Sequence, residues 1–434
     1  MKSHQTPTRW WRLMPLALLL ASHQSSFASA LISRGSSTRT VDATAATPTK
    51  IAGSPPSASN NDKKKRKSRR ARIKHDEKVV FFPTAARRSE DGKGWDIPIH
   101  GWIYEPETRD PARRAIVASL RKYLGLKREE EETKILKRRL GTFLVNNERR
   151  KELAVQMGCS VASGESCRVF PLPQSKKNGH FQAMLQIDDQ ELAAIQEATC
   201  DEKNTLHFQA IVEDGDDRVF EGMSHLIPNE GVSVISDIDD TVKITGVGNK
   251  KALLRSTFME EFKQVPGMAE LYQEWAEDLD CKFHFVSSSP WQLWEELAGF
   301  LSDIGFPHAT YHLKPIRLKD RTLFDLWKCP LETKIEVIES ILDSFPQRKF
   351  ILVGDTGEKD PEVYGEIARR YPNQIQGLYV RNVTGETGKE ERYDEAWVGV
   401  NREICHLFTE PQDIQLPASL TTSPPTNAKE ALKP

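Results

Sequence analysis

Short apolar segments that alternate with helical segments between residues 231 and 380 constrain the fold more than any other feature of the sequence. Five such segments have the length and composition of buried strands: Val232–Ser236, Phe283–Val286, Tyr311–Leu313, Phe350–Val353 and Ile375–Val380. Parallel strands need long crossover connections, and helices usually supply them. Residues 229–410 are therefore predicted to form an α/β domain with a parallel sheet and helices on both of its faces.

Residues 78–228 have a different pattern, in which strand-like segments alternate polar and apolar residues and are separated by Gly and Asp. This pattern predicts a β-rich, sandwich-like domain. Residues 107–158 interrupt it with apolar residues at helical spacing, so a helical insertion is expected there. The basic residues of the insertion would suit a membrane surface, and a solvated helix face is the alternative.

The two ends of the chain are expected to lie outside both domains. Residues 1–30 combine basic residues, the apolar run Leu13–Ala21 and a final Ala28-Ser29-Ala30, which is typical of a secretory signal peptide. Residues 31–77 are rich in Ser, Thr, Lys and Arg and are predicted to be a disordered basic linker. Residues 411–434 are rich in Pro, Ser and Thr and are predicted to be a disordered tail.

The signal peptide and the basic linker together resemble the two-part plastid presequence of algae with secondary plastids. A nuclear signal, an arm for anionic lipid or nucleic acid, and a solvated arm without a role are the alternatives. The expected location is therefore the secretory pathway, a plastid reached through it, or a cytoplasmic membrane-associated site. No segment reaches the roughly 20 apolar residues that a membrane-spanning helix needs.

Charge and cysteine content limit the classes of function. Residues 1–74 contain 15 Lys/Arg and 2 Asp/Glu, a balance of +13, so the rest of a chain with net charge −1 sums to −14. A basic arm thus precedes an acidic body, so the net charge says little about the working surface. No nucleic-acid partner is expected. The six cysteines contain no C-x-x-C pair, which argues against a zinc site. Only Cys159, Cys167 and Cys200 lie close enough in sequence to suggest a local disulfide, and Cys281 is predicted to be a buried thiol.

Two aspartates follow the first apolar strand, at the end of the sheet where ligands bind in α/β proteins. Asp237 and Asp239 lie two residues apart, so a tight turn would aim both carboxylates into one pocket. A divalent cation would offset their mutual repulsion. An EF-hand loop beginning at Asp237 is excluded, because that loop needs Gly and Glu where Val242 and Gly248 stand.

Polar residues also follow two other strands of the predicted sheet. Ser287 ends the second strand and is the better candidate for a phosphate ligand, whereas Ser289 is expected to be the N-cap of the helix that begins at Pro290. Asp355 follows the fourth strand, and Asp360 directly precedes a proline. Asp355 and Asp360 are predicted to converge on a metal ion, and an N-cap role for Asp360 has equal weight.

Lys334 opens a predicted helix and shares one face of it with Ile338 and Phe345. A lysine at the edge of a buried stripe would reach the end of the sheet where the aspartates lie. A free surface lysine is the alternative.

Together these motifs resemble the four-motif signature of the haloacid dehalogenase superfamily, with D-x-D-x-T at 237–241, Ser287, Lys334 and G-D-x4-D at 354–360. Longer stretches resemble the phosphatidate phosphatase family typified by the fungal actin-patch-associated enzyme. These stretches are SDIDDTVKITGV (236–247), VPGMAELYQEW (265–275), FHFVSSSPWQL (283–293) and FPQRKFILVGDTGEKDPEVYGEIARRYP (345–372). Upstream, FFPTAA (81–86) and HGWIYEP (100–106) also match, so the resemblance covers about residues 79–410.

The resemblance implies a Rossmann-like parallel sheet of haloacid-dehalogenase type and Mg²⁺-dependent hydrolysis of a phosphomonoester through an aspartyl-phosphate. Asp237 would be the nucleophile, and Asp239 would act as general acid and then as general base. Mg²⁺ would be held by Asp237, the backbone carbonyl of Asp239 and Asp355, with Asp360 bound directly or through water.

The resemblance also implies a phosphate site. Ser287 and Lys334 would bind the phosphate oxygens, and Thr241 would support the turn beside them. Only 45 residues separate Thr241 from Ser287, and 46 separate Ser287 from Lys334. Scaffold elements fill both intervals, so no large cap domain is expected and bulky substrates would have access.

The implied function is hydrolysis of phosphatidate to diacylglycerol and phosphate, with peripheral association to the membrane that contains this phospholipid. A phosphatase of phosphoproteins or other bulky phosphomonoesters is an alternative. A non-catalytic membrane adaptor is a second alternative, against which the four intact motifs argue.

Overall fold

The structure is a computed structural model, and it describes residues 50–51, 72–106, 111–123, 125–127, 130–158, 167–199, 204–246, 250–315 and 331–421. The predicted signal peptide, most of the predicted basic linker and residues 422–434 lie outside the described residues. None of the described helices has the length and apolar character that a membrane crossing requires.

Parts of the two segments predicted to be disordered are packed against the domains. Ile73 and Glu77 are buried, as are Pro411 and Leu420. Residues after 410 form a short 3-10 helix, η5 (Pro411–Asp413), and α12 (Ala418–Thr421). The expectation of disorder is therefore wrong for residues 72–77 and 411–421, and also for Lys50–Ile51, which form a strand paired with Met184 and Leu185.

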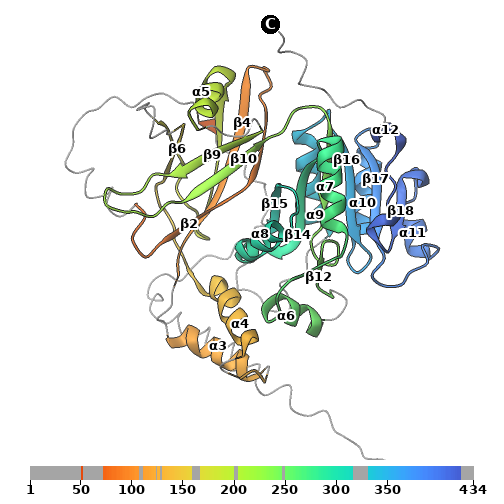
Figure 1. The fold of residues 1–434 in the computed structure, drawn as a ribbon, viewed down its shortest axis with the longest axis horizontal. Helices are drawn as coiled ribbons and strands as arrows, with labels where there is room; N and C mark the ends of the chain where they lie inside the picture. Colours follow the sequence, from red (N-terminus) through yellow and green to blue (C-terminus); the bar gives the residue numbers. More distant parts are fainter. Residues whose placement is uncertain are drawn as a thin grey trace, which may run out of the picture.

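Six parallel strands form the sheet of the C-terminal domain, in the order β15-β14-β11-β16-β17-β18 (Figure 1). The strands are β11 (Val232–Ser236), β14 (Lys282–Pro290), β15 (Ala309–Lys314), β16 (Lys349–Asp355), β17 (Ile375–Arg381) and β18 (Cys405–Phe408). The predicted α/β class with a parallel sheet is confirmed. β18, at one edge, is a sixth strand beyond the five expected.

Helices cover both faces of this sheet. They are α7 (Met268–Leu279), α8 (Trp294–Asp303), α9 (Leu331–Ser344), α10 (Asp360–Arg370) and α11 (Glu391–Ala396). Consecutive residues of a strand point to opposite faces. Val234 accordingly packs in the core with α7 and α8, and Ile235 packs in the core with α9 and α10. Because both faces are buried, the strands are continuously apolar.

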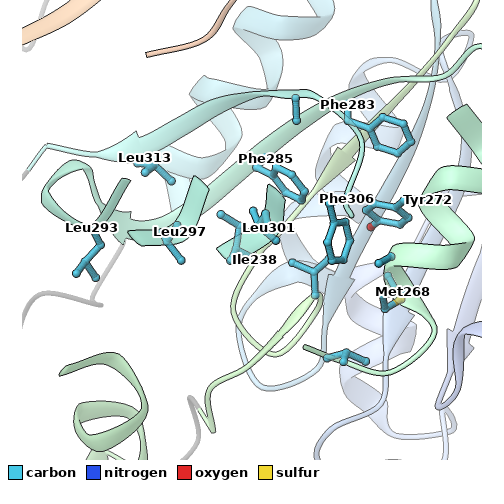
Figure 2. Packing of buried hydrophobic residues seen from close by; sticks show 14 of the residues in the cluster. Ile238, Met268, Tyr272, Phe283, Phe285, Leu293, Leu297, Leu301, Phe306 and Leu313 are labelled. Atoms are coloured by element: carbon cyan, nitrogen blue, oxygen red, sulfur yellow. The ribbon is translucent and has the colours of Figure 1, made fainter. Parts of the chain in front are cut away.

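The core on the α7 and α8 side is aromatic and lies directly beneath the strand that carries Asp237. Tyr272 stacks on Phe283 with ring centroids 5.2 Å apart and meets Phe306 edge to face. Figure 2 shows these rings with Met268, Phe285 and Ile238, the residue that follows Asp237. The loop after β11 is therefore anchored by an apolar side chain that is fully buried.

The upstream domain is a mixed, mostly antiparallel sheet. Its main path runs β1-β8-β4-β3-β10-β9-β6-β7, and β2 and β5 pair with β4. The strands are β1 (Lys50–Ile51), β2 (Lys78–Phe82), β3 (Thr84–Arg88), β4 (Gly94–Glu105), β5 (Asn146–Asn147), β6 (Ala154–Met157), β7 (Arg168–Pro171), β8 (His180–Asp188), β9 (Thr205–Ala210) and β10 (Glu221–Leu226). One helix, α5 (Asp189–Thr199), follows β8.

This sheet curls around a single core. Phe81 of β2 meets both Phe181 of β8 and Phe208 of β9 edge to face, at centroid distances of 5.7 and 5.1 Å. These partners come from well-separated places on the strand path, so the sheet folds back on itself as the two layers of a sandwich would. Cys167, which precedes β7, is disulfide-bonded, whereas Cys281 and Cys405 are free and Cys281 is buried as predicted.

The first part of the helical insertion predicted at 107–158 contains two α-helices and a short 3-10 helix: α3 (Pro111–Tyr123), α4 (Glu131–Gly141) and η1 (Thr142–Leu144). The prediction is wrong for residues 146–157, which contain β5 and β6 of the upstream sheet. In Figure 1 α4 lies beside α6 (Lys250–Phe258) of the C-terminal domain. The buried guanidinium of Arg139 joins them, because its Nη1 donates to the carbonyls of Thr257 at 2.9 Å and Glu260 at 2.7 Å. The insertion therefore belongs to the upstream domain by sequence and contacts the C-terminal domain in space.

A second contact between the domains lies next to the serine motif. Trp291 begins η2 (Trp291–Leu293), directly after β14. The centroid of its ring lies 4.1 Å from the ring centroid of Phe82 and 4.9 Å from that of His100. Both of these residues belong to the upstream sheet. The upstream domain thus packs against the segment that follows Ser287–Ser289.

Candidate active site

The carboxyl ends of β11 and β16 lie side by side and bring three aspartates together. One carboxylate oxygen from each of Asp237, Asp355 and Asp360 lies within 4.8 Å of the other two. All three side chains are buried. Burial, reinforced by the neighbouring carboxylates, raises the pKa of Asp237 and of Asp355 well above the ordinary value. We call these three residues the acidic triad.

A glycine makes this approach possible. A methyl group on Gly354 would lie 2.1 Å from Oδ2 of Asp360, closer than any side chain tolerates. The same Oδ2 accepts a hydrogen bond from the backbone N–H of Asp355 at 3.1 Å. Oδ1 of Asp355 accepts from the N–H groups of Gly357 and Glu358, at 2.6 and 3.2 Å. These bonds fix the turn and leave Oδ2 of Asp355 facing the triad.

The acidic triad fits a metal ion. Both carboxylate oxygens of Asp237 and Oδ2 of Asp355 are buried without a hydrogen-bond partner among the described residues. Unpaired buried carboxylate oxygens are strongly destabilising. A hard cation such as Mg²⁺ or Ca²⁺ takes carboxylate oxygens as ligands and would satisfy all three atoms. The triad is therefore a candidate metal site.

Lys334 lies against the triad. Its Nζ donates to Oδ1 of Asp360 at short range and lies 3.6 Å from Oδ1 of Asp237. Burial by itself would lower the pKa of Lys334, but Asp237 and Asp360 raise it well above the ordinary value. Lys334 is only 7% exposed, so the free surface lysine considered above is wrong.

The side chain of Asp360 makes contacts in the acidic triad and does not cap the helix in which it lies. α10 begins at Asp360, and its N-cap position is Lys359, without a side-chain cap. The Asp360 carboxylate instead accepts from Lys334 and from the Asp355 N–H. The N-cap role that we considered for Asp360 is therefore wrong.

The side chain of Asp239 lies outside the triad. Its Oδ1 is 2.6 Å from Nζ of Lys243 and accepts from Oγ1 of Thr245 at 2.8 Å. Its Oδ2 accepts from the hydroxyls of Ser289 at 2.8 Å and Ser287 at 3.2 Å. Burial alone would raise the pKa of Asp239, but Lys243 and the hydroxyl donors hold that pKa below its ordinary value. The surroundings therefore raise the pKa of Asp237 and lower the pKa of Asp239, although both aspartates belong to the D-x-D motif.

The expected helix cap at Ser289 is wrong. β14 continues to Pro290, and the following helix has Pro290 at its N-cap position. Ser289 therefore belongs to the strand end, where its hydroxyl binds Asp239. Ser287 lies beside it, and the Oγ of Thr241 is buried without a partner among the described residues.

Sequence reasoning missed Lys243, Thr245 and Glu358. Lys243 follows Asp239 by four residues, so a basic residue close behind the motif was a usable signal. Its burial was not readable, because the side chain is enclosed by residues distant in sequence. Glu358 lies 3.8 Å from Lys334, and burial raises the pKa of Glu358 to about 7.

Residues 232–382 match the family described as the catalytic domain of phosphatidate phosphatase APP1. Phosphatidate phosphatase APP1 of Saccharomyces cerevisiae is 32% identical over 187 residues, which are 42% of this chain and 31% of that protein. An uncharacterized protein of Schizosaccharomyces pombe is 28% identical over 223 residues, which are 50% of this chain and 34% of that protein. The chain therefore spans well under half the length of these fungal relatives.

Among solved structures, a candidate beta-phosphoglucomutase from Thermotoga maritima overlaps with a TM-score of 0.25 and 14% identity, over 42% of this chain and 95% of that chain. The four sequence motifs and the acidic triad all lie inside the segment that the family match covers. Residues 232–382 of this chain are thus similar to the catalytic domain of phosphatidate phosphatase APP1.

Proposed function

We propose that this chain is a Mg²⁺-dependent phosphatase that forms an aspartyl-phosphate on Asp237, and that its substrate is phosphatidate. The observation that carries the proposal is the pair of unpartnered, buried carboxylate oxygens of Asp237 beside the Lys334 ammonium. A carboxylate without hydrogen-bond donors keeps its lone pairs available for attack on phosphorus. Structural carboxylates are normally paired, so this one is a strong candidate for chemistry.

In the proposed reaction an oxygen of Asp237 attacks phosphorus while the ester oxygen leaves. The Lys334 ammonium and the Ser287 hydroxyl would bind the other phosphate oxygens and stabilise their charge. Asp239 would protonate the leaving oxygen and then accept a proton from the water that hydrolyses the aspartyl-phosphate. General acid–base catalysis of this kind typically contributes about 10²–10⁴-fold.

Asp237, Asp355 and Asp360 are the residues that would hold the metal ion, with the backbone carbonyl of Asp239 as a further proposed ligand. When bound, Mg²⁺ would supply positive charge that offsets the carboxylates and the phosphoryl oxygens. The same aspartates would repel a phosphate ester in the metal-free protein, so binding of the ester would depend on the cation.

The choice of phosphatidate rests on the family match and on the yeast relative, which is described as a phosphatidate phosphatase. A phosphomonoester at a lipid headgroup needs a site that a bilayer surface can approach. We therefore propose peripheral association with a membrane that contains phosphatidate.

The decisive experiment measures phosphate release from phosphatidate in mixed micelles, from phosphopeptides and from small phosphomonoesters, with Mg²⁺ or with EDTA. We expect Mg²⁺-dependent release that is fastest with phosphatidate and falls to background in Asp237→Asn. Preferred hydrolysis of phosphopeptides would replace the lipid by a protein substrate. Absence of hydrolysis of every substrate, with a folded protein, would favour the non-catalytic adaptor.

A further inference from the structure

We infer that Lys243 is a positioning residue that determines which oxygen of Asp239 faces the reacting phosphate ester. This inference rests on the proposed function, and it adds a residue outside the four motifs. Lys243 and Asp239 are both almost fully buried, and Nζ lies 2.6 Å from Oδ1. A buried ion pair with this geometry holds both side chains in one orientation.

The contacts of Asp239 divide its two oxygens between two segments. Oδ1 binds only groups of the segment that follows the D-x-D motif, namely Lys243 and the hydroxyl of Thr245. Oδ2 binds the hydroxyls at the end of β14, from Ser287 and Ser289. An ammonium group can only donate hydrogen bonds, whereas a serine hydroxyl donates and accepts. A proton on Asp239 is therefore carried by Oδ2, on the side of the phosphate ligand Ser287.

Residues outside the D-x-D-x-T motif hold Lys243 in place. It begins β12 (Lys243–Ile244), which pairs with β13 (Lys263–Gln264) as a two-stranded ribbon. Its Nζ lies 4.9 Å from the centroid of the Phe262 ring and donates to Oγ1 of Thr245 at 2.5 Å. A cation over an aromatic face is attracted by the ring quadrupole.

The helical insertion of the upstream domain supports the same ring. The guanidinium of Arg139, on α4, lies 3.7 Å from the centroid of Phe262. Arg139 also donates to the backbone carbonyls of Ser256 and Thr257 in the last turn of α6 and of Glu260 just after it. A continuous set of contacts therefore runs from α4 through Phe262 and Lys243 to Oδ1 of Asp239, the oxygen opposite the one that carries the proton.

The chemical role follows from this orientation. As an oxygen of Asp237 bonds to phosphorus, the bond from phosphorus to the ester oxygen breaks. The negative charge of the bound ester favours the protonated form of Asp239. The proton on Oδ2 then passes to the leaving oxygen and gives a neutral alcohol, while Oδ1 stays bound to Lys243. Without Lys243, Oδ1 keeps only the Thr245 hydroxyl, which can accept as well as donate, so the proton is no longer confined to the oxygen that faces the leaving group. Loss of this proton slows the reaction of an ester whose leaving group is an alkoxide, because an alkoxide needs the proton. It has little effect on an ester whose leaving group is stable as an anion.

The test compares kcat/KM of Lys243→Met for an alkyl phosphomonoester and for p-nitrophenyl phosphate, with Mg²⁺ present. The value kcat/KM reports the step in which the ester bond breaks, so later hydrolysis of the aspartyl-phosphate does not affect it. We expect a fall of about 30-fold or more for the alkyl ester, a large part of the ~10²–10⁴-fold that proton transfer contributes, and of less than about 5-fold for the aryl ester. Lys243→Arg, which keeps the charge and the donors, should recover part of the alkyl activity. The exposed Lys134→Met is the matched control and should change neither value.

Equal losses for both esters in Lys243→Met would reveal a purely structural role and overturn the inference, as would unchanged activity with both. Asp239→Asn must show the same division between esters, since otherwise Asp239 is not the proton donor and Lys243 has nothing to position. Retained activity in Asp237→Asn would instead overturn the proposed function itself. The three variants therefore separate failure of the inference from failure of the function on which it rests.

Discussion

Single atoms decide the geometry of the candidate active site, and Gly354 shows this most directly. Oδ2 of Asp360 occupies the space that a side chain at position 354 would fill. Asp237 and Asp355 in turn have oxygens that no described residue satisfies. At the residue scale the site is thus a tightly packed group of carboxylates whose charge is only partly offset by Lys334.

Gly354→Ala should abolish most activity while the domain stays folded. The added methyl group would displace Asp360, and a misplacement of about 1 Å in a site can cost roughly 100-fold in rate. The measurement is kcat/KM together with circular dichroism. Gly299→Ala is the matched control, because a methyl group there meets nothing within 4 Å. Since Gly299 lies in α8, its replacement should stabilise the protein by up to ~1 kcal/mol and leave kcat/KM unchanged.

Mg²⁺ should raise the melting temperature of the wild-type protein. An ion that binds only the folded state stabilises it by about 2.7 kcal/mol at a concentration 100 times its Kd. Asp355→Asn removes one charge from the triad and should abolish most of this shift. A calorimetric scan with and without Mg²⁺ checks the prediction without any substrate. An equal Mg²⁺ shift in Asp355→Asn would place the ion elsewhere.

At the scale of secondary-structure elements, helices and strands carry site residues to one another from distant parts of the chain. β11 and β16 are neighbours, so Asp237 and Asp355 meet although 117 residues lie between them. α4 reaches the C-terminal domain through Arg139, whose guanidinium is buried against the carbonyls in the last turn of α6 and just after it. The insertion therefore supports the ribbon that contains Lys243.

Arg139→Met should destabilise the protein by about 2–4 kcal/mol, because it leaves buried carbonyls without donors. The adjacent Arg138→Met is the control. Arg138 is about half exposed and pairs with Glu296, so its loss should cost less than about 1 kcal/mol. Urea unfolding of both variants measures the difference. Similar losses for the two would contradict a specific anchoring role of Arg139.

At the scale of the whole molecule, the two domains pack around half-buried imidazoles. His100 and His180 lie 3.1 Å apart between their ring nitrogens and meet Trp291 of the other domain. Burial lowers the pKa of His180 to about 4, and burial likewise lowers the pKa of His225 and of His312 to about 4. These rings are neutral in the folded state over the range where free histidine becomes charged.

Through these histidines, acid should therefore destabilise the protein in the pH range where free histidine becomes charged. Between about pH 6.5 and 4 the unfolded chain binds protons that the folded state excludes, so stability rises with pH in this window. Each such histidine contributes about 2 kcal/mol at pH 7 relative to pH 5, from roughly 1.4 kcal/mol per pKa unit. Urea unfolding at the two pH values measures the net pH dependence, from which the opposite contribution of Asp237, Asp355 and Glu358, with raised pKa values in the folded state, is subtracted. His312→Gln should show a smaller pH dependence than the wild type, and an unchanged dependence would contradict the assignment.

The location of the protein is a further prediction at this scale. A fluorescent protein carrying residues 1–75 should enter the secretory pathway, because these residues combine a basic start, an apolar run and a small-residue site. A reporter carrying only residues 31–75 is the control and should stay outside the pathway. Secretory entry of the shorter reporter, or cytosolic retention of the longer one, would contradict the prediction.

The sequence by itself determined the parallel sheet and the residues at its carboxyl ends. Asp237, Asp355 and Lys334 were identifiable because strand periodicity is local and the polar residues that end each strand are adjacent in the chain. These signals need no knowledge of distant contacts.

Only the tertiary structure decided how the polar side chains are partnered. Ser289 binds Asp239 instead of capping a helix, Asp360 binds Lys334 instead of capping its own, and Lys243 is buried beneath Phe262. Residues 411–421, rich in proline and polar side chains, pack against the core. The physical reason is that burial and pairing depend on which elements meet in space. The hydrogen bond between Ser289 and Asp239, for example, joins residues 50 positions apart, and the sequence around each residue does not predict it.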